Sequence, residues 1–180
     1  MKNNQIIFNH IEDAHVQISK EFAALYPYMT QLLDKASKIE FTLNGNQRFR
    51  QYIWTNANGH TSGWLCKLEH CTPQGRNLTD EHILLAWTMG GIIDYWLADE
   101  SKDAQSFIQA NDFTFSLTDS HVGIGGWEDN YIRQCKTKGI EPLDTSNFVT
   151  FALEANGNTT FYDYNTKEVF IYLHDDYSPF

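Results

Sequence analysis

Asn-Gly turn signals between short extended segments constrain the fold of this chain most strongly. The signals are Asn44-Gly45 between residues 40–43 and 48–54, Asn58-Gly59 before residues 64–68, and Asn156-Gly157 between residues 148–153 and 159–162. Asn-Gly favours the tight turns that connect neighbouring antiparallel strands. Residues 92–97, 113–117 and 168–173 are also strand-like. We therefore expect a mainly antiparallel sheet.

Three segments carry helical signals instead. Apolar residues recur at helical spacing from Ile11 to Ala36, and Pro27 is expected to divide this stretch into two helices. Thr79 and Asp80 can cap a short helix that Gly90-Gly91 ends. Residues 128–138 begin with acids and end with bases, which suits a helix dipole. The sequence predicts an α+β fold with N-terminal helices and short helices packed on the sheet.

The length and composition indicate one folded domain. Hydrophobic residues make up 42% of the 180 residues and aromatic residues 14%, which is too apolar for a disordered chain. No repeat or long linker divides the sequence, so we expect residues 1–180 to form a single domain. The residues after Met1 form no secretory leader and no stretch is long enough to cross a bilayer. Three cysteines fit a reducing compartment, and we expect a cytoplasmic protein.

The charge is unevenly distributed along the chain. The net charge is −10, and residues 1–93 carry eight acidic and eight basic side chains, whereas residues 94–180 carry 15 acidic and 5 basic ones. Such a field repels phosphate backbones and anionic lipids, and it speeds the encounter with basic partners. We therefore expect a basic protein partner, no direct nucleic-acid binding and no membrane binding.

Two stretches near the middle and the end of the chain resemble the bacterial SUKH superfamily. They are Leu-Thr-Asp-Glu-His-Ile-Leu-Leu-Ala-Trp-Thr-Met-Gly-Gly-Ile-Ile at 78–93 and Asn-Phe-Val-Thr-Phe-Ala-Leu-Glu-Ala-Asn-Gly at 147–157, and the ending Glu-Val-Phe-Ile-Tyr-Leu-His-Asp-Asp at 168–176 is similar too. The resemblance implies an α+β protein without established catalysis. Many bacterial members are immunity proteins that neutralise toxins, often nucleases, and eukaryotic relatives include a regulator of cell-wall synthesis. Residues 1–70 are not covered.

Two clusters of side chains could bind a metal ion. Cys66, His70 and Cys71 offer thiolate and imidazole ligands, but no paired Cys-x-x-Cys motif supports zinc, and a buried thiol is the favoured interpretation of Cys66. His174-Asp175-Asp176 could hold a cation or act in acid–base chemistry, although a solvated strand end is favoured. We expect no metal site and no cofactor.

Catalytic motifs are absent from the sequence. Gly123-Ile124-Gly125-Gly126 lacks the Lys-Ser/Thr of a phosphate-binding loop, so a turn is the favoured interpretation. No nucleophile has a recognisable signature with a base beside it. We expect no catalytic residues and a protein that is not an enzyme.

The acid-rich segment 94–129 is the candidate partner-binding surface, because eight acids face only Lys102 there and aromatic side chains lie between them. The alternative is an ordinary solvated face over core aromatics. The candidate residues are Asp94, Trp96, Asp99, Glu100, Asp103, Asp112, Asp119, Trp127, Glu128 and Asp129. The leading hypothesis is an immunity protein whose acidic surface neutralises a basic, nuclease-like toxin. A regulatory or scaffolding protein of the same fold is the first alternative, and a metal-dependent hydrolase using His174 with Asp175 or Asp176 is the second.

Overall fold

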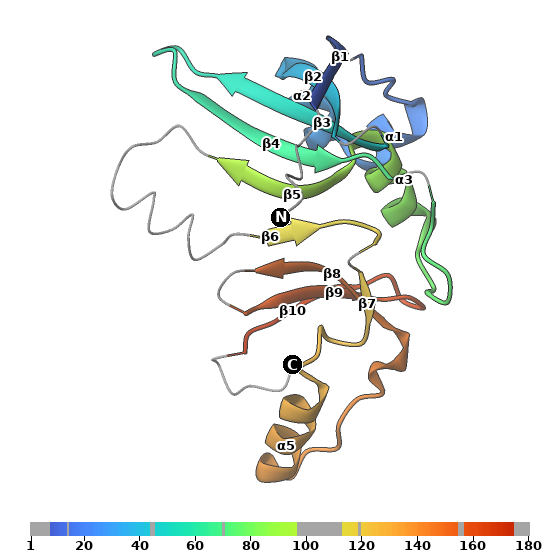
Figure 1. Cartoon of the computed structure of the whole chain (residues 1–180). Helices are drawn as coiled ribbons and strands as arrows, with labels where there is room; N and C mark the ends of the chain where they lie inside the picture. Colours follow the sequence, from blue (N-terminus) through green and yellow to red (C-terminus); the bar gives the residue numbers. More distant parts are fainter. Residues whose placement is uncertain are drawn as a thin grey trace, which may run out of the picture.

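An antiparallel sheet forms the framework of the molecule (Figure 1). The computed structural model describes residues 8–13, 15–43, 46–69, 71–96, 113–118, 120–154 and 157–174, with the backbone alone for 8–13, 95–96, 113–115 and 154. The strands are β1 (Phe8–Asp13), β2 (Ser37–Leu43), β3 (Gln47–Thr55), β4 (Thr61–Lys67), β5 (Gly91–Trp96), β6 (Phe113–Phe115), β7 (His121–Val122), β8 (Phe148–Glu154), β9 (Thr159–Asp163) and β10 (Val169–Tyr172). Their order is β1-β2-β3-β4-β5-β6-β8-β9-β10, with β7 paired beside β8. The predicted α+β fold with a mainly antiparallel sheet is confirmed.

The N-terminal segment contains a strand before its helices. Helices α1 (Lys20–Leu25) and α2 (Pro27–Lys35) are separated at Tyr26, with Pro27 opening the second helix, as predicted. The prediction of helix from Ile11 was wrong, because residues 8–13 are β1 and pair with β2. Five of the six residues of β1 have register partners in β2, with a register shift at Ile11. This pairing overrides the apolar periodicity, to which Ile11 alone contributed in this segment.

Helix α3 (Asp80–Met89) begins and ends where local signals predict. The hydroxyl of Thr79 accepts a hydrogen bond from the backbone N–H of His82 at 3.3 Å, which satisfies a free donor of the first turn. Gly90 ends the helix at φ 89°, and a Cβ there would lie 3.0 Å from the Cβ of Cys66. Glycine is thus required both by the turn and by the close approach of β4.

Two hydrophobic clusters lie on opposite faces of the sheet. The first packs α1, α2 and α3 on the N-terminal strands, with Phe22, Leu33, Tyr52, Ala86 and Met89 buried in it. The second packs helix α5 (Glu128–Lys138) on β8, β9 and β10 and includes Tyr131, Phe161 and Tyr172. Successive residues of a strand point to opposite faces. Because Phe161 contacts the α5 cluster and Tyr162 contacts α3, the two sets of helices cover different faces.

Glu69 and Arg76 connect the two halves of the sheet at the point where few strand residues pair. Strands β5 and β6 share one register pair, Ile92 with Phe115. The buried carboxylate of Glu69 accepts hydrogen bonds from the backbone N–H groups of Leu117 at 2.7 Å and Thr118 at 3.0 Å, and from the Thr118 hydroxyl. Arg76 Nη1 donates to the carbonyl oxygens of the same two residues at 3.0 and 2.9 Å.

Glu69→Gln is expected to lower the free energy of unfolding by about 2 kcal/mol, since it turns one acceptor oxygen into an NH₂ donor facing an N–H donor. Urea denaturation of the variant and the wild type measures the difference. Glu141→Gln, at an exposed position, is the matched control and should change stability by less than about 0.5 kcal/mol. Equal values for both variants would contradict the role assigned to Glu69.

Candidate partner-binding surface

The predicted acidic residues lie on separate elements. Asp94 is exposed on β5, and Asp129 is exposed in the first turn of α5. The side chain of Trp96 and the residues Asp99, Glu100, Asp103, Asp112 and Asp119 lie outside the described residues. The grouping of these side chains into one surface therefore stays a prediction.

Trp127 and Glu128 make contacts that hold the fold together. The indole Nε1 of Trp127 donates to the carbonyl oxygen of Gly157 at 2.9 Å, and its ring stacks on His174 with 5.1 Å between ring centroids. The carboxylate of Glu128 accepts the backbone N–H of Ile124 at 2.5 Å. Trp127 and Glu128 were predicted as partner contacts. Both also have a structural role, and for Trp127 this is the role that the alternative interpretation assigned to core aromatic residues.

The turn 123–126 is a structural turn, as its favoured interpretation held. Gly123, Gly125 and Gly126 all have positive φ, which glycine adopts at little cost. A Cβ at Gly123 would collide with the carboxylate of Glu128. Because a carboxylate occupies the N–H of Ile124, the turn presents negative charge where a phosphate-binding loop would present donors.

The metal-binding candidates gain no support from the geometry. Cys66 is fully buried, which confirms the favoured interpretation of a buried thiol, and burial raises the pKa of that thiol to about 12. His70 lies outside the described residues, as do Asp175 and Asp176. His174 stacks on Trp127 and its Nδ1 lies 3.2 Å from Asn158 Oδ1. Within the described ranges, no three His, Cys, Asp or Glu side chains are placed to share a metal ion.

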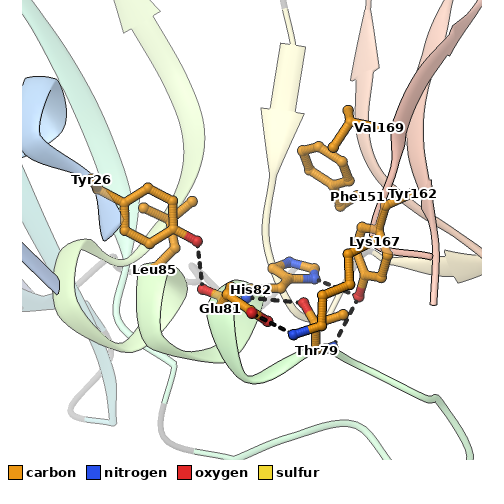
Figure 2. A pocket seen from close by; sticks show the side chains of 9 residues that line it. All are labelled: Tyr26, Thr79, Glu81, His82, Leu85, Phe151, Tyr162, Lys167 and Val169. Atoms are coloured by element: carbon orange, nitrogen blue, oxygen red, sulfur yellow. Dashed lines mark hydrogen bonds and ion pairs between the residues drawn. The ribbon is translucent and has the colours of Figure 1, made fainter. Parts of the chain in front are cut away.

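A cavity of about 270 Å³ opens between α3 and the C-terminal strands, and we call it the α3–β9 pocket (Figure 2). Tyr26 and Leu85 stand on one side of it, and Phe151 and Val169 on the other. Its full lining is Tyr26, Thr79, Glu81, His82, Leu85, Phe151, Tyr162, Lys167 and Val169. Tyr26 lies between α1 and α2, Thr79 caps α3, and the other residues come from α3, from β8, β9 and β10 and from the turn before β10, so the pocket lies where the two halves of the chain meet.

Hydrogen bonds tie the polar groups at the base of the pocket to one another. The Tyr162 hydroxyl accepts the backbone N–H of Thr79 at 3.3 Å and lies 3.2 Å from His82 Nδ1. Burial lowers the pKa of His82 to about 4, so the imidazole is neutral at pH 7. The rings of His82, Phe151 and Tyr162 lie 5.7 to 5.8 Å apart, giving the pocket an aromatic base.

An ion pair and a second carboxylate lie at the pocket mouth. Lys167 Nζ lies 2.5 Å from Glu81 Oε1, and this pairing holds the pKa of Glu81 below its ordinary value. Asp80 lies next to this pair on α3 and also interacts electrostatically with Lys167. Two carboxylates therefore accompany one ammonium at the mouth.

An exposed apolar stripe on β10 continues the pocket across the same face of the sheet. Phe170 and Tyr172 face the α5 cluster, so Val169, Ile171 and Leu173 point to the opposite face. These three aliphatic side chains are 62%, 53% and 45% exposed, and we call them the β10 stripe. Val169 belongs to both the stripe and the pocket wall. Among the described strands β10 pairs only with β9, so the stripe lies on an edge strand.

Sequence reasoning missed the pocket and the stripe. The pocket residues are far apart in the sequence, and only the packing of helices α1 and α3 against each other and against the strands brings Tyr26, His82 and Tyr162 together. The stripe did leave a signal. Residues 169–173 are apolar at every position rather than at alternate ones, which indicates a strand with two apolar faces.

Comparisons of this chain with family models, curated proteins and solved structures found no match. The resemblance to the SUKH superfamily accordingly stays an expectation from the sequence. No helix in the described part of the chain has the length and apolar character needed to span a membrane.

Proposed function

We propose that this protein binds and neutralises a basic, nuclease-like toxin of the kind that SUKH immunity proteins oppose, and that it does so in the cytoplasm without catalysis. The observation that carries the proposal is the uncovered apolar face formed by the β10 stripe and the α3–β9 pocket. Exposed apolar patches with polar surroundings are typical of protein-interaction sites. Three aliphatic side chains on an edge strand are costly to leave in water unless a partner covers them.

The charge of the surrounding surface favours a basic partner. Three of the five basic residues in the acidic half, Arg133, Lys136 and Lys138, lie on α5, which covers the other face of the sheet. Lys167 is paired with Glu81. Asp80 and Glu81 outnumber Lys167 beside the pocket, and the whole chain has a net charge of −10, which speeds encounter with a cation-rich protein.

Growth rescue tests the proposal. A basic protein captured from the host by the tagged chain and released by moderate salt would be expressed alone, where it should stop growth, and then with this protein, which should restore growth. Ile171→Asp should weaken the complex at least about tenfold, because it places a charge in the apolar contact. Ile140→Asp, at an equally exposed aliphatic position after α5, is the matched control and should rescue like the wild type.

Two results would contradict the proposal. A captured partner that is harmless when expressed alone would favour a regulatory or scaffolding protein of the same fold. If Ile171→Asp and Ile140→Asp rescue growth equally well, the partner does not contact the β10 stripe.

A further inference from the structure

The size of the α3–β9 pocket selects what can fill it. A dry cavity of about 150 Å³ is enough to hold benzene, and pockets for drug-sized molecules begin at about 300 Å³. At about 270 Å³, the pocket matches an aromatic group of one or two rings. Tyr26 and Leu85 oppose Phe151 and Val169 across the opening, which favours a flat group between the two walls (Figure 2).

The polar groups of the pocket favour an uncharged group at its base. The Tyr162 hydroxyl and the backbone N–H of Thr79 are hydrogen-bonded to each other, and Tyr26 donates its hydroxyl hydrogen to the carbonyl oxygen of Glu81 at 2.9 Å. No charged side chain lines the base, since the ion pair between Glu81 and Lys167 lies at the mouth. A buried charge there would lose hydration without a counter-charge.

The mouth of the pocket favours positive charge around that aromatic group. Asp80 and Glu81 accompany Lys167 there, so carboxylates outnumber the ammonium. The pocket wall also continues into the β10 stripe through Val169, so a molecule seated in the pocket can extend over an apolar surface too large for one small ring. A polypeptide chain with one inserted side chain fits both features, because interface hot spots are often aromatic anchors in such pockets.

We propose that the α3–β9 pocket is the anchor site for a single aromatic side chain, of the tryptophan or tyrosine kind, that basic residues flank in the protein partner. This inference rests on the proposed function and names the contact that binds the partner. The anchor lies between Leu85 and Phe151, the flanking cations face the carboxylates at the mouth, and the following residues of the partner cover the β10 stripe.

Capped tripeptides test the anchor directly on the isolated protein. Acetyl-Lys-Trp-Lys-amide should shift the amide resonances of His82, Leu85 and Val169 in ¹H–¹⁵N spectra, with a Kd on the order of 1 mM for one filled pocket. Acetyl-Glu-Trp-Glu-amide and acetyl-Lys-Ala-Lys-amide should each bind at least about tenfold more weakly. Leu85→Trp fills the pocket and should abolish the shifts. If Leu85→Trp folds poorly, Val169→Trp is used instead, because its larger side chain blocks the pocket from a more exposed position in the wall.

The outcomes separate this inference from the function on which it rests. No shift with Lys-Trp-Lys at about 10 mM, roughly ten times the expected Kd, would overturn the anchor. Free indole that binds as well as the tripeptides, with no preference between Lys and Glu flanks, would overturn the assignment to a basic polypeptide. Full growth rescue by Leu85→Trp would overturn the anchor and leave the neutralising function standing. If the Lys-Trp-Lys peptide binds but the protein neutralises no toxin, the proposed function is refuted and the assigned specificity of the pocket is supported.

Discussion

Arg50→Met is expected to lower the free energy of unfolding by about 3–5 kcal/mol, because it leaves a buried carboxylate without its main partner. Arg50 Nε and Nη2 donate to Glu40 Oε1 at 2.8 and 2.6 Å, and both side chains are only 11% exposed. Arg50 Nη1 also donates to the carbonyl oxygen of Thr88 at 2.9 Å and to the Tyr52 hydroxyl at 3.1 Å. The variant thus removes the link that Arg50 makes between Glu40 on β2 and the C-terminal end of α3.

Two further variants show whether the ion pair causes that loss. Arg48 Nη2 lies 2.5 Å from Glu40 Oε2, but its side chain is 46% exposed, so Arg48→Met should cost less than about 1 kcal/mol. Adding Glu40→Gln to Arg50→Met removes the buried charge that has lost its main partner and should recover part of the lost stability. Guanidinium denaturation measures all three. Similar losses for Arg48→Met and Arg50→Met, or no recovery in the double variant, would contradict this assignment.

The acidity of Glu40 gives the same network a pH dependence. Burial by itself raises the pKa of Glu40, but the hydrogen bonds and charges of Arg50 and Arg48 outweigh burial and hold that pKa below its ordinary value. A carboxyl group with a lowered pKa in the folded state stabilises the protein above its unfolded pKa. That contribution is lost as the pH falls through the folded pKa.

Elements with local signals were predictable from the sequence. Thr79 caps α3 and Gly139 ends α5 in the left-handed conformation, because each effect depends on a few neighbouring residues. The strand pair β8–β9 lies on either side of Asn156-Gly157 as expected. The strand β1 was not predictable in this way, since it exists through pairing with residues about 30 positions away.

The candidate site was less predictable than the fold because its residues meet only through the sheet. His82 and Tyr162 are 80 positions apart, and nothing near either residue in the sequence indicates their contact. Charge density alone selected the acidic set, and it could not distinguish exposed Asp129 from Glu128, whose carboxylate accepts a backbone N–H.

His82 is expected to make the protein less stable by about 3 kcal/mol as the pH falls from 6.5 to about 4, which follows from its pKa of about 4 in the folded state. Burial holds the imidazole neutral beside the Tyr162 hydroxyl, with the Glu81–Lys167 ion pair at the mouth of the same pocket. The unfolded chain takes up a proton below pH 6.5 while the folded chain does not. The contribution is therefore complete above pH 6.5 and is lost between 6.5 and about 4.

Replacing the imidazole should remove this pH dependence of stability, however much overall stability each variant loses. His82→Gln and His82→Phe should both reduce, by about 3 kcal/mol, the difference between the free energies of unfolding at pH 7 and pH 4. Tyr162→Phe is the matched control, because it removes the hydroxyl but keeps the titrating group and should preserve most of the pH dependence. Titrating carboxylates such as Glu40 contribute equally in every variant and cancel in the comparison. If the pH dependence persists in both His82 variants, the loss of stability in acid must arise from the carboxylates instead.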